Sequence, residues 1–200
     1  DDAVSGFFIQ LPLPDGLDPL DLISRIDPAK DVDGLSPNSA GRLAVGLPSL
    51  LPCTPHGIIQ MLRRNDIELS GKKAVILGRS NLVGKPLVQL FLKENATVTV
   101  CHSRTRDLPE VAREADVLVA AIGRREMVGA EYVKDGAAVV DVGIHRKEDG
   151  GLTGDVDFEE VEPKAAWISP VPGGVGPMTR AMLMYNTLQA ARAAEDAGTI

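Results

Sequence analysis

The sequence has few cysteines, no excess of basic residues and no long apolar run. Its two cysteines, Cys53 and Cys101, stand far apart and outside any Cys-x-x-Cys pattern. This excludes a disulfide framework and a cysteine-based zinc site, and it favours a reducing compartment. The 21 basic and 28 acidic residues give a net charge of −7. Because nucleic acids and anionic membranes both bind basic surfaces, we expect neither as a partner.

Membrane and export signals are also missing. No apolar stretch approaches the roughly 20 residues that cross a bilayer. No basic segment followed by a hydrophobic block stands at the N-terminus. No three candidate ligands have metal-like spacing, so we expect no metal ion. With 44% hydrophobic and 24% charged residues in a chain of 200, the composition is that of a folded protein with a substantial core, and we expect a cytoplasmic one.

From about residue 70 the sequence alternates between short strands and helices. Three continuous apolar runs are typical of strands buried on both faces: KKAVILG, DVLVAAIG and GAAVVDVG. ATVTVCH and AAWISPVP predict two further strands, while KPLVQLFLKEN and RDLPEVAREA, with Asp107 as N-cap, have helical spacing. This alternation predicts a parallel, doubly wound sheet.

The two ends of the chain are organised differently. GFFIQLPLP predicts a strand ended by prolines, and TPHGIIQMLRRN predicts a helix with Thr54 as N-cap and Pro55 in its first position. The segment MTRAMLMYNTLQAARAAEDA predicts a long amphipathic helix. It is long enough to reach back from the sheet to the N-terminal region. We therefore expect two α/β lobes with a cleft between them.

GRSNLVGKP, residues 78–86, stands where a doubly wound fold binds its ligand, at the end of the first strand. Gly78 would allow the tight bend and Gly84 a close approach of helix and strand, while the helix N-terminus favours a phosphate. Ser80 occupies the second glycine position and could offer a hydroxyl donor. A dinucleotide site and a plain strand-to-helix turn both fit this pattern.

The end of the next strand, CHSRT, distinguishes between cofactors. NAD sites usually carry an acidic residue there to bind the ribose hydroxyls. The segment CHSRT has no acidic residue. Ser103, Arg104 and Arg79 instead offer hydrogen-bond donors and positive charge suited to a 2′-phosphate. NADP is therefore favoured, with a solvated surface role as the alternative for Arg104.

Two further motifs predict a site for a flat heterocycle. DPAKDVDGLSP is a proline-stiffened loop with three aspartates. A metal-binding loop and a solvated turn are alternative interpretations, although the segment lacks the ligand spacing of an EF-hand. Asp33, next to Gly34, is the best candidate for a bidentate hydrogen-bond pair with a heterocycle. PVPGGVGPMT, residues 170–179, forms a rigid ledge, poor in side chains, against which a flat ligand can lie, or else a linker rich in helix breakers.

Together these motifs, with FIQLPL, PCTPHG and DVGIHR, resemble in order those of the methylenetetrahydrofolate dehydrogenase/methenyltetrahydrofolate cyclohydrolase family. The resemblance covers essentially the whole chain. It implies a partial N-terminal α/β catalytic domain, residues 1–54 and 176–200, plus a Rossmann-like doubly wound NADP-binding domain, residues 55–175. It also implies tetrahydrofolate derivatives as ligands and a homodimer that associates through the cofactor domain.

The resemblance further assigns residues to each ligand. Asp33 would hold the pterin ring, which agrees with its candidacy above. The residues implied for NADP are Gly78, Arg79, Ser80, Ser103 and Ile144. The residues implied for the folate pocket are Ile9, Gln10, Leu11, Asp33, Pro172, Gly173, Gly174, Val175 and Gly176.

One departure from the family is large. Its members carry a Tyr-x-x-x-Lys motif in an additional N-terminal stretch, and that motif is absent from this sequence. Either the sequence is incomplete at its N-terminus or the natural chain is truncated, and the opening on a strand-like run favours the former. Gln10 has no titrating group near neutral pH, so it could orient that lysine or a water but not act as base. Two rivals are a non-catalytic dimerisation scaffold and a dehydrogenase of the shikimate or amino-acid type.

Overall fold

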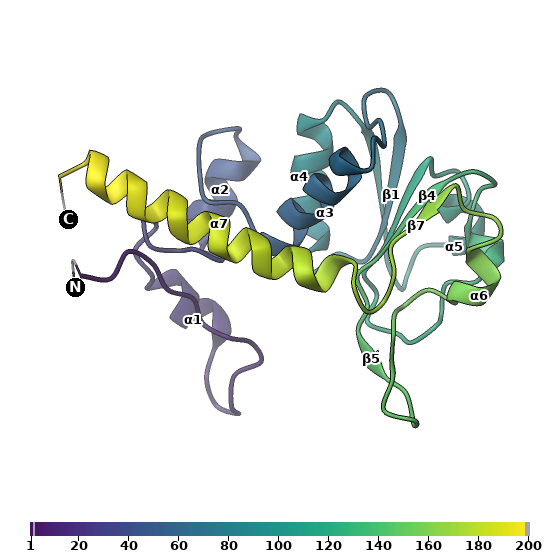
Figure 1. The fold of residues 1–200 in the computed structure, drawn as a ribbon, viewed down its shortest axis with the longest axis horizontal. Coiled ribbons are helices and arrows are strands. Elements are labelled where there is room, and N and C mark those ends of the chain that lie inside the picture. The colour runs from purple at the N-terminus through teal and green to yellow at the C-terminus, as the bar shows by residue number, and fades with distance from the viewer. Residues whose placement is uncertain (2, 199–200) are drawn as a thin grey trace.

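The computed structural model describes residue 1 and residues 3–198. Its centre is a five-stranded sheet in which every neighbouring pair is parallel, in the order β2-β1-β3-β4-β7 (Figure 1). This confirms the doubly wound α/β fold. The strands are β1 (Lys73–Leu77), β2 (Thr97–Cys101), β3 (Val117–Ala120), β4 (Ala138–Asp141) and β7 (Trp167–Ile168).

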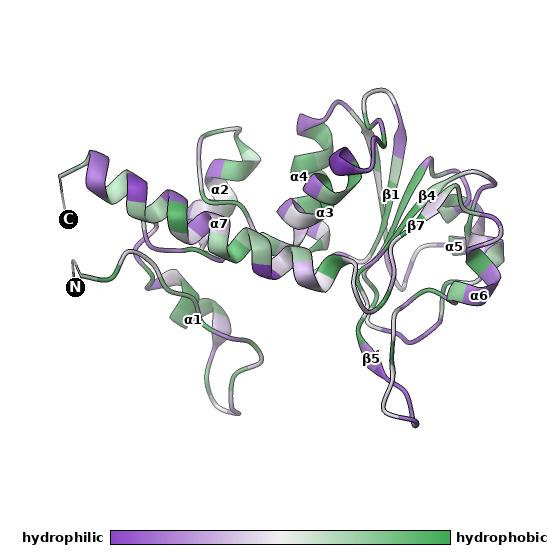
Figure 2. Cartoon of the chain, viewed as in Figure 1, coloured by the Kyte–Doolittle hydropathy of each residue, from purple (hydrophilic) through white to green (hydrophobic). Residues whose placement is uncertain are grey.

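Apolar side chains on both faces explain why these short segments form a parallel sheet. Along β1, Ala74 and Ile76 enter one core, while Val75 and Leu77 enter the other. The first core contains residues of α3 (Cys53–Arg64) and α4 (Gly84–Lys93). The second contains residues of α5 (Leu108–Ala112), η1 (Ala130–Tyr132) and α6 (Phe158–Val161). Figure 2 shows the resulting hydrophobic sheet.

The strand order creates a crevice at the carboxyl ends of the strands, between β1 and β3. The chain runs from β1 outward to β2 through α4, and then returns to β3 on the other side of β1. Because consecutive connections leave β1 in opposite directions, the carboxyl ends of β1 and β3 frame a switch point, where doubly wound folds bind ligands.

Local predictions near the N-terminus were partly wrong. GFFIQLPLP is not a strand, because only Phe7 forms a bridge, to Asp31, and Pro12 and Pro14 have no N–H to extend a ladder. The third helix starts at Cys53, so Thr54 lies inside it instead of capping it. Asp107 does precede α5, but its side chain makes no capping hydrogen bond. The remaining elements are α1 (Pro19–Ser24), α2 (Pro37–Ala44) and the hairpin β5 (His145–Arg146) with β6 (Leu152–Thr153).

The long C-terminal helix predicted from the sequence runs from the sheet toward the N-terminal segment (Figure 1). α7 (Val175–Asp196) starts at the sheet, packs on α3 and ends beside the N-terminal segment (Figure 1). Its buried Asn186 donates from Nδ2 to the carbonyl oxygens of Val32 and Leu51, at 2.9 and 2.8 Å. None of the helices among the described residues combines the length and hydrophobicity needed to cross a bilayer.

We expect Asn186→Ala to lower the free energy of unfolding by about 3 kcal/mol, because two buried carbonyl groups lose their donor. Urea denaturation measures this. Leu188→Ala is the matched control on the same helix, since Leu188 is 48% exposed, and it should cost less than about 1 kcal/mol. Equal losses in the two variants would show that the hydrogen bonds of Asn186 do not stabilise the fold.

Candidate functional site

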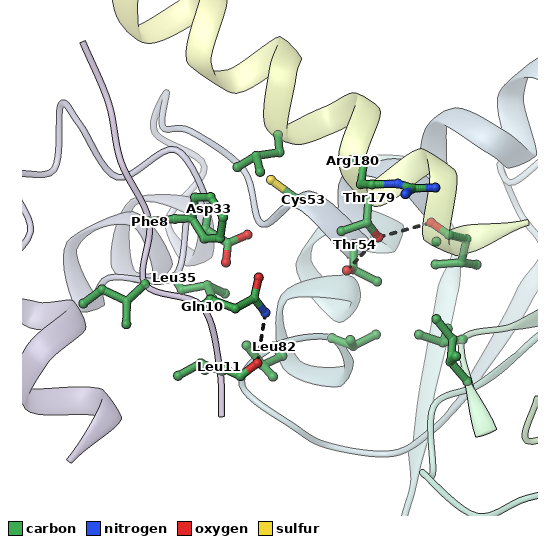
Figure 3. A pocket seen from close by; sticks show the side chains of 17 residues that line it. Phe8, Gln10, Leu11, Asp33, Leu35, Cys53, Thr54, Leu82, Thr179 and Arg180 are labelled. Carbon is green, nitrogen blue, oxygen red and sulfur yellow. Dashed lines mark hydrogen bonds between the residues drawn. The ribbon is translucent and has the colours of Figure 1, made fainter. Parts of the chain in front are cut away.

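A cleft of about 420 Å³ lies between the N-terminal segment, α3 and the first half of α7 (Figure 3). Apolar side chains form most of its wall, among them Phe8, Leu35 and Leu82. Asp33 and Gln10 point into it, as Figure 3 shows. Few polar groups in an apolar concavity are typical of a site that orients a small organic ligand.

Two of the loop's aspartates have separate tasks. Asp31 is buried, and its carboxylate accepts hydrogen bonds from the backbone N–H groups of Gly34, Leu35 and Ser36 and from the Ser39 hydroxyl. These bonds stiffen the loop from within. Asp33 instead lines the cleft, and its carboxylate points into it (Figure 3).

The environment of Asp33 changes its acidity. Burial raises the pKa of Asp33 above its usual range, and the charge of Asp31 adds to this, while a hydrogen bond from Cys53 opposes it. Burial likewise raises the pKa of the Cys53 thiol, and the charge of Asp33 adds to the effect. Cys53 is therefore a protonated donor at neutral pH and not a nucleophile.

A second cavity, of about 330 Å³, lies along the ledge motif and shares Ile144, Val175, Gly176 and Arg180 with the cleft. The turn of the ledge has no room for a side chain at Gly174, because a Cβ there would lie 2.5 Å from the Pro170 carbonyl oxygen. The helix begins at Val175, so residues 175–179 of the predicted ledge belong to the start of α7.

A third cavity, of about 340 Å³, occupies the switch point, and we call it the turn cavity. Gly78 has φ +125°, and a Cβ there would overlap the Ala121 carbonyl, while a Cβ on Gly84 would overlap the backbone of Gly78. Both glycines therefore have the predicted roles of bend and close approach. The Ser80 hydroxyl accepts a hydrogen bond from the Val83 N–H at 3.1 Å and can still donate its own proton.

The structure gathers most of the predicted site residues into these three cavities. Ile9, Gln10, Leu11 and Asp33 line the cleft. Pro172, Gly173 and Gly174 line the ledge cavity, and Val175, Gly176 and Ile144 line both. Gly78, Arg79, Ser80 and Ser103 line the turn cavity. Arg104 is the exception, because it is exposed beside Ser103 and does not line the turn cavity.

Sequence reasoning missed several residues of these walls. Arg124 lines the turn cavity together with Arg79, and its signal was its place four residues after the end of β3, at the same edge of the sheet. Thr54 and Thr179 face the cleft, with their hydroxyl oxygens 2.9 Å apart. Arg180 carries the positive charge between the cleft and the ledge cavity. Only the pairing of α3 with α7 brings these three together.

The chain matches known proteins along nearly its whole length. The family described as "Tetrahydrofolate dehydrogenase/cyclohydrolase, NAD(P)-binding domain" matches residues 52–195. The "Bifunctional protein FolD 1" of Rubrobacter xylanophilus is 74% identical over 196 residues, which are 98% of this chain and 69% of that protein.

Solved structures agree with this match. The bifunctional FolD methylenetetrahydrofolate dehydrogenase/cyclohydrolase of Campylobacter jejuni is 48% identical, with a TM-score of 0.94 over 96% of this chain and 69% of its own. The Trypanosoma brucei N5,N10-methylenetetrahydrofolate dehydrogenase-cyclohydrolase, solved with NADP cofactor and inhibitor, is 40% identical, with a TM-score of 0.88 over 95% of this chain and 67% of its own. The chain belongs to the tetrahydrofolate dehydrogenase/cyclohydrolase family.

Proposed function

We propose that this chain carries out the NADP-dependent oxidation of 5,10-methylenetetrahydrofolate to 5,10-methenyltetrahydrofolate, and that in the complete enzyme the product is hydrolysed to 10-formyltetrahydrofolate. The observation that carries the proposal is that the cleft and the ledge cavity share Ile144, Val175 and Gly176. A pterin in the first and a nicotinamide in the second would therefore meet at one wall. The scaffold and shikimate-type alternatives are not favoured, given 74% identity to a bifunctional relative.

In this proposal the cleft binds the folate. Asp33 accepts two N–H groups of the pterin ring, since a carboxylate is the natural partner of a paired donor edge. Ile9 and Leu11 pack against the ring, and Gln10 orients either a water or a catalytic group. Val175 and Gly176, the ledge residues that line the cleft, support the reacting end of the folate.

The turn cavity would hold the adenosine half of NADP, and its residues fit that group. Gly78 and Gly84 bring the start of α4 close to β1, which leaves helix N–H groups for the pyrophosphate. Arg79 and Ser103 supply charge and a hydroxyl for the 2′-phosphate. Arg104 contributes by its charge alone. NADP, when bound, would supply the hydride acceptor, and Ile144 would lie at its nicotinamide end.

The two reactions ask different things of the chain. Hydride removal leaves a stabilised methenyl cation, so the residues need only hold the two ligands face to face. Hydrolysis needs an activated water. No lysine lines the described cleft, and Gln10 and the protonated Cys53 cannot act as base.

We also propose a cytoplasmic homodimer that associates through the cofactor lobe. Support comes from β2, which pairs only with β1 among the described strands and therefore has a free edge. Residues Thr97, Thr99 and Val100 on this strand are exposed. Both cysteines are unpaired, which suits a reducing compartment.

We expect residues 1–200 to form methenyltetrahydrofolate from 5,10-methylenetetrahydrofolate only when NADP is present, and to hydrolyse added methenyltetrahydrofolate far more slowly than a full-length relative. Absorbance of the methenyl product and of NADPH follows both steps. Shikimate with NADP is the negative control. Hydrolysis at a full-length relative's rate, or no NADP reduction, would refute the assignment.

Arg79→Ala should weaken NADPH binding about tenfold or more, because a charged donor to the 2′-phosphate is lost. NADH, which lacks that phosphate, should bind the variant and the parent protein within about twofold. Fluorescence titration measures both. Arg106→Ala is the matched control, since Arg106 is an exposed arginine in the β2–α5 connection that follows Ser103 and does not line the turn cavity. An equal loss of affinity for NADH would show that Arg79 does not bind the 2′-phosphate.

The affinity for tetrahydrofolate should fall as the pH falls through the raised pKa of Asp33, because the ionised carboxylate binds the ring and protonation removes an acceptor. Asp33→Asn should bind weakly at every pH and lose this part of the pH dependence. Anaerobic calorimetry from pH 5 to pH 8 measures it. Asp15→Asn, at an exposed position of the N-terminal segment, should retain the parent profile. Parallel profiles for Asp33→Asn and its parent would rule the role out.

A further inference from the structure

The most deeply buried carboxylate near the site belongs to a residue that has no role in the proposal above. Asp155, just after β6, has a side chain that is 0% exposed. Its Oδ2 accepts hydrogen bonds from the backbone N–H groups of Ile122 and Gly123, at 2.6 and 2.9 Å. Its Oδ1 accepts from Nε2 of His145 at 2.8 Å. A buried charge is tolerated only with such a full set of donors.

These bonds join segments that are distant in the sequence. Ile122 follows β3 and lines the turn cavity. His145 opens β5, directly after Ile144. The backbone N–H of Asp155 in turn donates to Asp141 Oδ1 at 2.9 Å, which ties the hairpin to the end of β4. One side chain thus connects the wall of the turn cavity with the wall shared by the cleft and the ledge cavity.

The surroundings fix these groups in place. A Cβ on Gly143 would lie 2.5 Å from Oδ1 of Asp155, and a Cβ on Gly154 would overlap the carboxylate of Asp141. Both positions therefore require the absence of a side chain. The two carboxylates fill the space that these glycines leave, so the segment cannot shift without breaking hydrogen bonds.

Ile144 needs such support from its neighbours. Its side chain is 61% exposed, so packing alone does not hold it. Ile144 lines both the cleft and the ledge cavity. It lies near Gly176, because a Cβ built on Gly176 would be 3.8 Å from Cδ1 of Ile144. The imidazole of the next residue, His145, is anchored, because its side chain is only 23% exposed and is bound to Asp155.

We propose that His145 and Asp155 are positioning residues that hold the Ile144 turn against the nicotinamide end of the cofactor, while Asp155 separately holds the segment at Ile122 against the adenosine end. This rests on the proposed function, because the two ends are those of bound NADP. The proposal predicts that loss of the His145 imidazole weakens binding at the nicotinamide end only. The adenosine end is retained, because the two backbone hydrogen bonds to Asp155 remain.

The test compares the binding of NADPH with that of 2′,5′-ADP, which has the adenosine end alone. His145→Ala should weaken NADPH about tenfold, the scale of one lost hydrogen bond to a charged group, and leave 2′,5′-ADP within about twofold of the parent. His145→Gln, whose amide N–H can still reach Asp155, should restore NADPH binding. Arg146→Ala is the matched control, since it removes an exposed basic side chain from the same strand.

Each outcome has a distinct meaning. Unchanged NADPH binding in His145→Ala overturns the positioning role, and so does an equal loss for both ligands, which indicates general loosening of the lobe. Failure of Gln to restore binding also overturns it. If the parent chain binds neither ligand, the proposed function itself fails, and the positioning role fails with it. Asp155→Ala is not used, because it would leave two N–H groups unpaired as well.

Discussion

The side-chain amide of Asn186 ties the long helix α7 to the N-terminal part of the chain. It donates to one carbonyl on the aspartate loop and to another just before α3, from the middle of a helix whose first turn belongs to the ledge. The walls of the cleft therefore depend on one helix that both lobes share. A helix transmits position along its length because its backbone hydrogen bonds are internal. Asp33 and the ledge keep a fixed separation for this reason.

The aspartates around the site serve two different purposes. Asp31 and Asp155 are saturated by backbone and side-chain donors, and both organise loops. Asp33 lines the cleft instead, and burial raises the pKa of its carboxyl although a hydrogen bond from Cys53 opposes the rise. The same residue type thus serves as scaffold or as ligand contact, depending on how many donors surround it.

Close backbone approach is the second constraint on the site. Gly78 and Gly84 at the turn cavity, and Gly174 at the ledge, each stand where a Cβ would meet a carbonyl group. These contacts bring main chain, with its fixed dipoles, to the surface that a flat ligand would touch. Side chains then add charge at the rim, as Arg79 and Arg124 do. The result is a site in which shape comes from the backbone and selectivity comes from a few side chains.

The sequence by itself determined the parallel sheet, the long returning helix and the glycine turn, because periodicity, propensity and glycine placement act over a few residues. It also singled out Asp33, and the resemblance singled out Ile144. Tertiary structure alone decided that Asp31 is consumed by its own loop, that Arg124 and not Arg104 lines the turn cavity, and that Phe7 and its neighbours form no strand. It also paired His145 with Asp155 across the hairpin. Such outcomes depend on which groups distant in the sequence become neighbours in the fold, and local sequence patterns do not predict those contacts.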